Sequence, residues 1–448
     1  MGMAPTEVRV AAGAGGEIVA GATAVMPSAD WRPATLLIYV PAPLYLRDGE
    51  YLLEDQACNG LRRWTENFER LIVVIPVAPG EPPKSWVPLR AAVGEAMDRI
   101  EVVPVPDAFR PDRFLRELPR TVPTLRAAIG KADYLGFALG GLFGDWGAVG
   151  AILAHRMGLP FYVWTDRVES EVVRRSMSSG PLKRRLQAFL YHRPMAMLER
   201  YLIRRAALGL FHGRETFETY APFSPQPQLV HDIHLKKADQ ITAEVLAAKQ
   251  AGVVQGPIRI CYVGRADQMK GPLDWIEVLR RLAARGVDFR AVWLGDGADL
   301  PAMRDLVGKA GLSGQVDLPG FVTDRGRIMR ELRDSHVMMF CHKTPESPRC
   351  LIEALAAGTP IVGYDSAYPQ DLIAENGGGS LVPLNDIGAL AADMERLARD
   401  RAALSDLVGR AARDGALFDD ETVFHHRAEL IRAYLPRARP FGMADEAR

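Results

Sequence analysis

The chain has 448 residues, 48% of them apolar, and its 55 basic and 55 acidic side chains give a formal net charge of zero. This length is enough for two or three domains, and the balanced charge argues against binding to nucleic acid. The four cysteines (Cys58, Cys261, Cys341 and Cys350) have neither a metal-site spacing nor a disulfide framework, which predicts reduced thiols in a cytoplasmic protein without a metal.

After residue 30 the chain alternates apolar strands with helices. Residues 1–30 are rich in Ala and Gly, lack the pattern of a signal peptide, and are expected to form an N-terminal tail. Strands are expected at 35–40, 70–77, 100–106, 132–139, 160–166 and 207–213, and helices at 57–68, 114–130 and 147–158. Apolar strands that alternate with helices predict a parallel sheet covered on both faces.

Residues 167–205 interrupt this pattern with a basic stretch. They contain ten Lys or Arg and three Glu, interleaved with Met, Leu, Phe and Tyr. One interpretation is a solvated pair of helices, and the other is a patch that docks on an anionic membrane surface, such as the inner face of the plasma membrane. No apolar run reaches the roughly 18 residues of a membrane span, so such docking would be peripheral.

A second alternating series follows residues 221–257, a segment that begins rich in Pro and Gln and that we interpret as the link between two halves. Strands are expected at 258–265, 289–297, 315–322, 337–343 and 360–366, and helices at 272–286, 300–312, 326–335 and 386–416. The predicted fold class is α/β, with two Rossmann-like domains that face a cleft. We assign 31–250 to an N-terminal domain, 256–415 to a C-terminal domain, and 418–436 to a helix that packs back on the N-terminal domain.

The first candidate site residues lie in YVGRADQMKG, after the first strand of the second half. Gly264 ends the strand, Arg265, Lys270 and Gly271 follow, and Pro272 opens the next helix. This order places two cations at a strand end beside a helix N-terminus, where amide groups and the helix dipole favour anions. The segment predicts a diphosphate site, and the alternative is a pair of solvated cations beside a turn.

The second group lies in TPESPRCLIEALAAGTP, where Glu346 and Glu353 bracket Arg349, Cys350 and Leu351. Glu353 is expected in the first turn of a helix, where a carboxylate either stabilises the helix dipole or accepts hydrogen bonds from the two hydroxyls of a ribose. Glu346 is expected in the preceding loop, as a cleft residue or an exposed acid. Amides near Cys350 and Leu351, with the charge of Arg349, are expected to bind a phosphate between the two glutamates.

Taken in order, VGR-x4-KG, LGDG, PGFV and the acidic pair before EALAAGTP resemble the donor half of family-4-type (group 1) retaining glycosyltransferases of the GT-B fold, over residues 258–400. The resemblance implies a metal-independent hexosyltransferase with a nucleotide-sugar donor, UDP- or GDP-linked, and no other cofactor. It implies a glycan or lipid-linked acceptor in bacterial polysaccharide or glycoconjugate synthesis. It also implies that the N-terminal domain at 31–250 binds the acceptor and that the C-terminal domain at 256–415 binds the nucleotide sugar. By resemblance, Arg265 and Lys270 hold the diphosphate, Glu353 binds the ribose, and Glu346 contacts the transferred sugar. The resemblance implies that Glu346, Arg265 and Lys270 act in catalysis.

This sequence departs from the family pattern in three ways. The two glutamates have six intervening residues instead of seven, and Pro348-Arg349 replaces an aromatic-glycine pair; either change moves Glu346 relative to the sugar. The N-terminal half lacks the glycine-rich acceptor loop and the histidine after an early strand that are common in the family. Its assignment therefore depends on the layout of its strands and helices.

Asp166 and three histidines are the remaining candidates. Asp166 follows the strand FYVWT and is interpreted as a helix cap, with a cleft residue as the alternative. His231 and His234 in VHDIH have no evident third metal ligand. For these two residues and His212, polar contacts in the link are favoured over cleft lining, and both are favoured over a metal site.

Other functions of this fold stay open. A sugar-nucleotide epimerase would use the same diphosphate site but needs additional acids and a histidine in the cleft. A non-catalytic partner subunit would keep the fold alone. A nicotinamide-dependent oxidoreductase is disfavoured because GFALGG, residues 136–141, lacks the Gly-x-Gly-x-x-Gly spacing.

Overall fold

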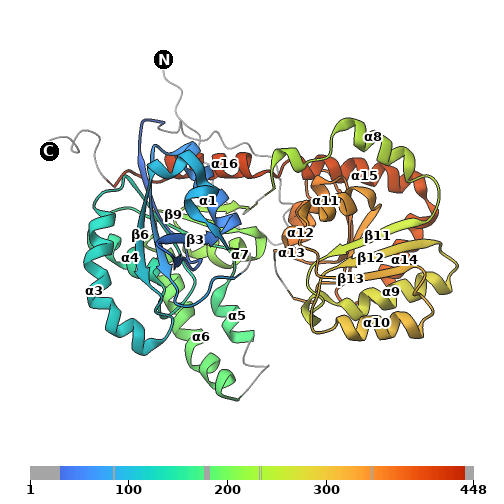
Figure 1. Cartoon of the computed structure of the whole chain (residues 1–448), viewed down its shortest axis with the longest axis horizontal. Coiled ribbons are helices and arrows are strands. Elements are labelled where there is room, and N and C mark those ends of the chain that lie inside the picture. Colours follow the sequence, from blue (N-terminus) through green and yellow to red (C-terminus); the bar gives the residue numbers. More distant parts are fainter. Residues whose placement is uncertain are drawn as a thin grey trace.

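The computed structural model describes residues 31–83, 86–175, 182–231, 233, 235–344 and 347–438. Within these ranges the chain forms two α/β lobes that lie side by side in Figure 1, each built on a parallel sheet. The predicted fold class, two Rossmann-like domains, is confirmed by this arrangement.

The N-terminal sheet is parallel at every neighbouring pair of strands. Its strands are β1 (Thr35–Tyr39), β4 (Arg70–Val77), β6 (Ile100–Pro106), β7 (Tyr134–Ala138), β8 (Tyr162–Thr165), β9 (Leu208–His212) and β10 (Pro227–Val230), in the order β10-β9-β8-β7-β1-β4-β6. Successive residues point to opposite faces, so Leu37 and Phe137 join one core cluster while Leu36 and Tyr134 join the other. Both faces are therefore covered, which explains the near-continuous apolar runs.

Helices cover the two faces of this sheet. One face packs against α3 (Pro111–Ile129), α4 (Trp146–Arg156) and α6 (Leu182–Ile203), and the other against α1 (Asp55–Asn67) and α16 (Asp420–Tyr434). Shorter helices are α2 (Leu89–Val93), α5 (Glu169–Arg175) and α7 (Gly213–Tyr220). Among the residues that the structure describes, no helix combines the length and the apolarity that crossing a membrane requires.

A small antiparallel sheet beside the N-terminal sheet was not predicted. It consists of β2 (Tyr45–Arg47), β3 (Glu50–Glu54) and β5 (Trp86–Pro88), in the order β2-β3-β5. Asp48 and Gly49 join β2 to β3, with φ of 51° and 80°. An Asp-Gly pair with positive φ at both residues is typical of a two-residue hairpin turn, so the sequence did carry a signal for this hairpin.

The C-terminal sheet is also parallel throughout. Its strands are β11 (Ile258–Val263), β12 (Phe289–Leu294), β13 (Val316–Gly320), β14 (Val337–Phe340), β15 (Ile361–Tyr364) and β16 (Gly379–Val382), in the order β13-β12-β11-β14-β15-β16. Its helices are α8 (Ala243–Gly252), α9 (Pro272–Ala284), α10 (Leu300–Lys309), α11 (Arg325–Asp334), α12 (Arg349–Ala356), α13 (Ala367–Leu372), α14 (Ile387–Arg399) and α15 (Arg401–Gly415). The single helix expected at 386–416 is wrong, because Asp400 ends α14 and its side chain accepts a hydrogen bond from Ala403 N to begin α15.

The link expected at 221–257 is shorter than predicted, because most of it belongs to the two lobes. β10 pairs with β9 at the edge of the N-terminal sheet. α8 packs against α15, and Lys249 of α8 donates hydrogen bonds to the C-terminal lobe. The N-terminal domain therefore ends near residue 230, and extending it to residue 250 was wrong.

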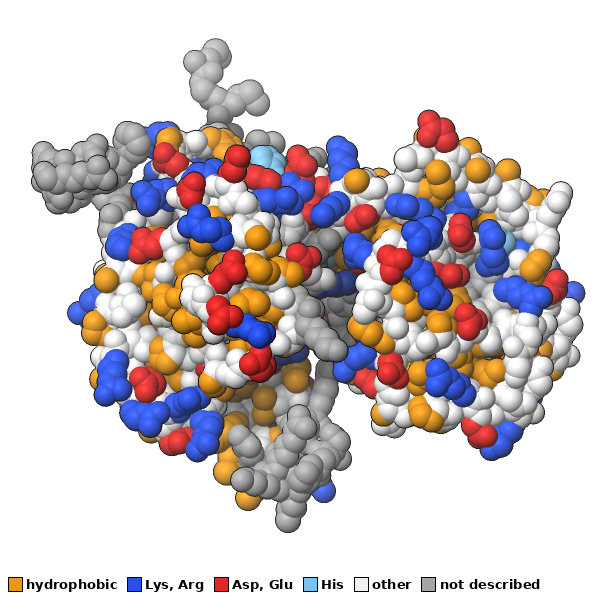
Figure 2. All heavy atoms as spheres, in the orientation of Figure 1, with side chains coloured by type: hydrophobic (Ala, Val, Ile, Leu, Met, Phe, Trp, Pro, Cys, Tyr) orange, Lys and Arg blue, Asp and Glu red, His pale blue; other side chains and the backbone are white. Residues whose placement is uncertain are grey.

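The chain crosses back to the N-terminal lobe at its last helix. Figure 1 shows α16 beside α1, and the two helices are in contact. Asp420 at the start of α16 accepts hydrogen bonds from Asn59 Nδ2 (2.8 Å) and Arg63 Nη2 (2.9 Å) of α1. Over the face shown in Figure 2, acidic and basic side chains are interspersed on both lobes, in keeping with the zero net charge.

Candidate functional site

Residues 264–271 form a firmly held loop at the carboxyl end of β11. The loop lies against the segment that follows β12, where the LGDG motif supplies Gly295 and Gly297. A Cβ at Gly295 would lie 1.9 Å from the carbonyl oxygen of Gly264, and one at Gly297 would lie 2.5 Å from that of Ala266. Only glycine permits this approach, so the motif fixes the loop that carries the predicted diphosphate residues.

The end of this loop sets the start of α9. Gly271 has φ of 63°, and a Cβ there would lie 2.2 Å from the carbonyl oxygen of Cys341.

The two predicted cations differ in environment. Lys270 is buried, with 8% of its surface exposed, whereas the side chain of Arg265 is 71% exposed and pairs with Asp267 at 3.1 Å.

A neutral hydrogen-bonded pair, Tyr262 and His342, and an ion pair, Asp274 and Lys343, lie near this loop. Tyr262 Oη and His342 Nε2 are hydrogen bonded at 2.7 Å. Burial, with the nearby charge of Lys270, holds the pKa of His342 well below its usual value, so the imidazole is neutral at pH 7. Asp274 in the first turn of α9 accepts a hydrogen bond from Lys343 Nζ at 2.8 Å, which balances that charge.

The second group of predicted residues surrounds α12, and the structure corrects the expected position of Glu353 in this helix. Glu353 is the fifth residue of the helix and lies in the second turn, not the first. Its Oε1 accepts a hydrogen bond from Arg325 Nη1 at 2.9 Å. Leu351 is a core residue whose amide donates to the carbonyl of Pro348 at 3.2 Å. Cys350 is partly buried and packs against the same core.

A cavity of about 490 Å³ opens between the two lobes. The C-terminal lobe contributes Arg265, Thr344, Ser347 and Arg349 to its lining, and the N-terminal lobe contributes Asp166, His212 and Glu215, among others. The structure thus brings the predicted residues Arg265 and Arg349 together opposite the N-terminal lobe. The predicted residues Gly264, Lys270, Gly271, Cys350, Leu351 and Glu353 do not line this cavity, and Glu346 lies outside the described residues.

The structure also gives the positions of Asp166, His212 and His231. The helix-cap interpretation of Asp166 is wrong, because α5 begins three residues later at Glu169 and Asp166 lines the cavity. His212 lines the same cavity. His231 lies 3.5 Å from Asp371 of the C-terminal lobe, and His234 lies outside the described residues. Within the described ranges, no three His, Cys, Asp or Glu side chains come together as a metal site would require.

Comparison with known proteins agrees with this geometry. Residues 247–414 match the family model of glycosyl transferases group 1. Residues 247–414 form a group 1 glycosyltransferase domain. This domain contains every predicted donor-site residue, including Arg265, Lys270 and Glu353.

Two curated relatives match longer stretches of the chain than the family model does. The chain is 29% identical over 263 residues to 2-deoxystreptamine N-acetyl-D-glucosaminyltransferase of Streptomyces fradiae, which covers 54% of this chain and 61% of that protein. It is 29% identical over 199 residues to the amylovoran biosynthesis glycosyltransferase AmsK of Erwinia amylovora, which covers 43% of this chain and 48% of that protein. The chain thus spans about half to three fifths of these relatives' length.

The whole fold is shared with a solved structure. HepE of Anabaena, determined in complex with UDP, matches with a TM-score of 0.62 at 14% identity, covering 88% of this chain and 98% of that one. The two lobes therefore have the GT-B arrangement of two Rossmann-like domains.

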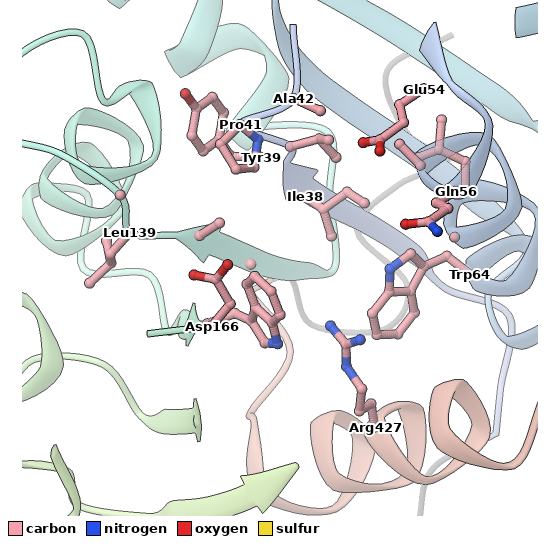
Figure 3. Close-up of a pocket in the computed structure, with 18 of the residues that line it drawn as sticks. Ile38, Tyr39, Pro41, Ala42, Glu54, Gln56, Trp64, Leu139, Asp166 and Arg427 are labelled. Atoms are coloured by element: carbon pink, nitrogen blue, oxygen red, sulfur yellow. The ribbon is translucent and has the colours of Figure 1, made fainter. Parts of the chain in front are cut away.

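A second cavity, of about 520 Å³, lies in the N-terminal lobe beside the group 1 glycosyltransferase domain (Figure 3). α1 contributes Trp64 to its wall, β8 contributes Trp164, and α16 contributes Arg427. Sequence reasoning missed these residues, because helix and strand patterns do not reveal which distant elements meet. The one local signal was the Trp-Thr-Asp end of β8, since ligands in such sheets bind at the carboxyl ends of strands.

The loop after β7 does not offer a free phosphate site. Asp145, the N-cap of α4, accepts hydrogen bonds from the amides of Gly140 (3.0 Å), Gly141 (3.2 Å) and Ala148 (3.1 Å). Burial raises the pKa of this carboxyl to about 6, against the effect of the hydrogen bonds. These amides therefore already bind an anion of the chain itself, which supports the earlier argument against a dinucleotide at GFALGG.

Proposed function

We propose that this protein is a glycosyltransferase that moves a hexose from a nucleoside-diphosphate sugar to a hydroxyl of a glycan or lipid-linked acceptor. The observation that carries the proposal is the cavity between the lobes. There, Arg265 and Arg349 of the group 1 glycosyltransferase domain face Asp166 and His212 of the other lobe. Two guanidinium groups beside a helix N-terminus suit a diphosphate, and the opposite wall suits a second substrate.

The proposed reaction exchanges one C–O bond for another. The bond between the anomeric carbon and the diphosphate breaks, and a bond from that carbon to the acceptor oxygen forms. The hydroxyl proton leaves with the nucleoside diphosphate. Negative charge grows on the diphosphate as the bond breaks, and Arg265 and Arg349 of the cavity lining stabilise it. Lys270, buried in the same loop as Arg265, adds a positive charge behind them.

We propose further that the reaction retains configuration at the anomeric carbon and uses no metal ion. Both features come from the family resemblance. The chain's own cations support the second, since guanidinium groups neutralise diphosphate oxygens through two-pronged hydrogen bonds. UDP is the first nucleotide to test because HepE, which shares the fold, was solved with UDP.

The relatives suggest the setting of the acceptor. One is named for transfer to 2-deoxystreptamine and the other for amylovoran biosynthesis. We propose that this chain acts in bacterial polysaccharide or glycoconjugate synthesis.

The test is a thermal-shift panel with UDP, GDP, ADP and dTDP in the presence of EDTA. A nucleotide at about one hundred times its dissociation constant adds roughly 2.7 kcal/mol of stability. We expect a selective shift in the wild type that is lost in Arg265→Ala/Lys270→Ala. The control is Arg280→Ala/Lys309→Ala, toward the C-terminal ends of α9 and α10 and away from the strand ends that bind ligands. No shift with any nucleotide would favour a non-catalytic partner subunit.

We also propose that α6 docks the enzyme on an anionic membrane. In this helix the buried face includes Ala188, Met195 and Leu202. Its exposed face is also apolar, with exposures of 57% to 71% for Leu186, Phe189, Leu190 and Met197. These positions lie on one side of a helix, and exposed arginines accompany them: Arg193 and Arg200 lie on the same side, and Arg185 lies at its edge.

Exposed apolar residues with basic neighbours are typical of helices that lie in the surface of anionic bilayers. Flotation with vesicles of phosphatidylcholine alone or with phosphatidylglycerol tests this docking. We expect binding only to the anionic vesicles, and its loss in Phe189→Ser/Leu190→Ser. Leu115→Ser on α3, at a position 64% exposed, is the control. Equal flotation of both variants would exclude α6 as the docking surface.

A further inference from the structure

The two lobes touch each other between α7 of the N-terminal lobe and α13 of the C-terminal lobe, which lie on facing sides in Figure 1. Gly213, the first residue of α7, has φ of 73°. A Cβ at this position would lie 3.1 Å from Ser347 Oγ and 3.3 Å from Cδ2 of Tyr368. The glycine therefore lets the N-terminal lobe approach two side chains of the C-terminal lobe closely.

One carboxylate, that of Asp371 in α13, makes the ion contacts across this boundary. Its Oδ1 lies 3.7 Å from Nη2 of Arg214 in α7, and its Oδ2 lies 3.5 Å from Nε2 of His231, which follows β10. Of the ion pairs between residues that the structure describes, these two are the ones that join the lobes. Burial lowers the pKa of His231 despite the nearby carboxylate, so Arg214 supplies the positive charge at pH 7.

This interlobe contact is close but not tight. The side chain of Asp371 is 8% exposed, yet its Oδ2 has no hydrogen-bond partner among the described residues, and neither has Nδ1 of His231. Charge-assisted hydrogen bonds are about 2.7–2.9 Å long, so the two contact distances exceed that length by at most about 1 Å. Because a buried carboxylate oxygen without a hydrogen bond is costly, a small rotation that shortens both distances is favoured.

The interlobe contact lies beside the segments that cross between the lobes. The ring of His231 lies 5.2 Å from that of Phe418, two residues before α16 in the second crossing segment. A contact beside the crossing segments limits how far the lobes rotate about them, and parts of the cavity farther from the crossing move more than the contact itself. A small change at Asp371 therefore produces a larger change across the cavity.

The interlobe contact also lies directly behind one wall of the cavity between the lobes. His212, which immediately precedes α7, lines this cavity, and Ser347 lines it from the C-terminal lobe. The ring of His212 lies 6.0 Å from that of Tyr368, in the same helix as Asp371. Asp371 itself lines neither this cavity nor the one in the N-terminal lobe, so its effect on a ligand in either of them is indirect.

On this basis we infer that Asp371 is a positioning residue: by binding Arg214 and His231 it sets the angle at which the loop at 264–271 faces the N-terminal lobe. This inference rests on the proposed glycosyltransferase function, and it adds a control of the lobe arrangement on which that reaction depends. A residue that only stabilised one lobe would leave the angle unchanged, so a distance measured between the lobes separates the two roles.

The test is single-molecule FRET on the full chain, with and without UDP. The dyes are attached to p-acetylphenylalanine, which replaces Leu115 in α3 and Lys309 in α10. These side chains are 64% and 70% exposed and lie in different lobes, so the labels report the separation of the lobes without entering either core.

The variants each remove one charge of the interlobe contact. They are Asp371→Asn, Arg214→Gln and the double variant, and the controls are Asp406→Asn and Arg280→Gln, which break exposed ion pairs within the C-terminal lobe. We expect the fraction of molecules with separated lobes to rise at least about fivefold in both single variants and to stay unchanged in the controls. The double variant should show no larger rise than Asp371→Asn alone, because both changes remove the same contact.

UDP affinity, measured by calorimetry, should change less than about twofold in every variant, because the predicted donor residues lie in the C-terminal lobe alone. Equal fractions of separated molecules in the wild type and Asp371→Asn would overturn the inference, and so would an equal rise in Asp406→Asn. A larger rise in the double variant than in Asp371→Asn would show that Arg214 acts through another contact, against the inference.

A loss of UDP affinity in Asp371→Asn would assign its effect to the C-terminal lobe itself, which also contradicts a role in setting the angle. Failure of UDP to bind the wild type would instead contradict the proposed function. The FRET comparison without UDP would then still decide whether Asp371 sets the arrangement of the lobes.

Discussion

Lys249 offers a sharp test of how the C-terminal domain is held together. Its Nζ lies at hydrogen-bond distance from the carbonyls of Leu332 (3.4 Å) and Ala357 (3.3 Å) and from Thr359 Oγ1 (2.5 Å). The two carbonyls lie at the C-terminal ends of α11 and α12, where a positive group also stabilises the helix dipole. We therefore expect Lys249→Met to weaken the domain, since it leaves three buried acceptors without this donor.

The size of the loss should depend on pH. Burial lowers the pKa of Lys249 from 10.5 to about 7. Between these two values the unfolded chain holds the proton and the folded chain releases it, so the free energy of unfolding rises with pH by up to about 1.4 kcal/mol per unit. Methionine does not titrate. The stability difference between the wild type and Lys249→Met should thus grow by about 2 kcal/mol from pH 7 to pH 9.

At pH 9 the neutral amine keeps two N–H donors, and two hydrogen bonds at about 1 kcal/mol each set the loss near 2 kcal/mol, so the loss at pH 7 is close to zero. Guanidinium titrations of both proteins at the two pH values measure these differences. Lys309→Met is the matched control, because this lysine is 70% exposed and pairs with Asp305 on the surface of the same domain. A loss of the same size at both pH values would refute the reasoning, and would mean that the three oxygens keep Lys249 charged throughout.

Three further predictions concern the loop before α9, the anchor of α16 and the two glutamates around α12. Gly271→Ala should lower UDP affinity at least about tenfold, because the new Cβ would lie 2.2 Å from the carbonyl oxygen of Cys341 and would displace the start of α9. Calorimetry measures the affinity. The control is Gly308→Ala, where a Cβ would have no atom within 4 Å. Asp420→Asn should lower the stability of the N-terminal lobe by about 3 kcal/mol in thermal unfolding, because it breaks the buried pair that anchors α16. Glu353→Ala should weaken UDP binding about tenfold, whereas Glu346→Ala should mainly lower turnover.

Each of these predictions has a clear contradicting result. Unchanged UDP affinity in Gly271→Ala would mean that the loop before α9 does not bind the nucleotide. For the α16 anchor, Asp406→Asn changes a carboxylate that is 66% exposed, and an equal loss there would remove the special role of Asp420. Equal donor affinity and equal rate in the two glutamate variants would defeat the assignment of their roles.

The fold could be predicted largely because burial on both faces leaves a continuous apolar run in each central strand. β4, RLIVVIPV, and β14, VMMF, are legible for that reason. Edge and surface elements do not carry this pattern. β10 begins with a proline and has only one buried residue, so its segment resembled a loop, although an edge strand tolerates proline at its first position.

The donor residues were accessible to sequence reasoning because they are local. Gly264, Arg265, Lys270 and Gly271 occupy one loop. A Cβ at Gly271 would meet the main chain of Cys341, and one at Gly264 would meet the ring of Tyr262. Their different exposures were not predictable, since Lys270 is buried by packing from outside its own loop.

The N-terminal cavity could not be predicted because it depends on a crossing of the chain. Arg427 meets Trp64 and Trp164 only because α16 returns from the far lobe to lie on α1. Spacing within a segment says nothing of such a meeting. The apolar and basic residues of α16 indicated a packed helix, and they did not indicate a cavity.

The way in which α16 is anchored has a consequence for motion between the lobes. The amide of Asp420 donates to the carbonyl of Leu235 at 2.8 Å, so the two segments that cross between the lobes run beside each other. The carboxylate of Asp420 meanwhile binds α1, so the helix stays with the N-terminal lobe. A rotation of the lobes about these crossing segments would move Arg265 and Arg349 relative to Asp166. It would leave Arg427 in place against its aromatic wall, so the cavity of the N-terminal lobe would keep its shape while its distance to Arg265 changed.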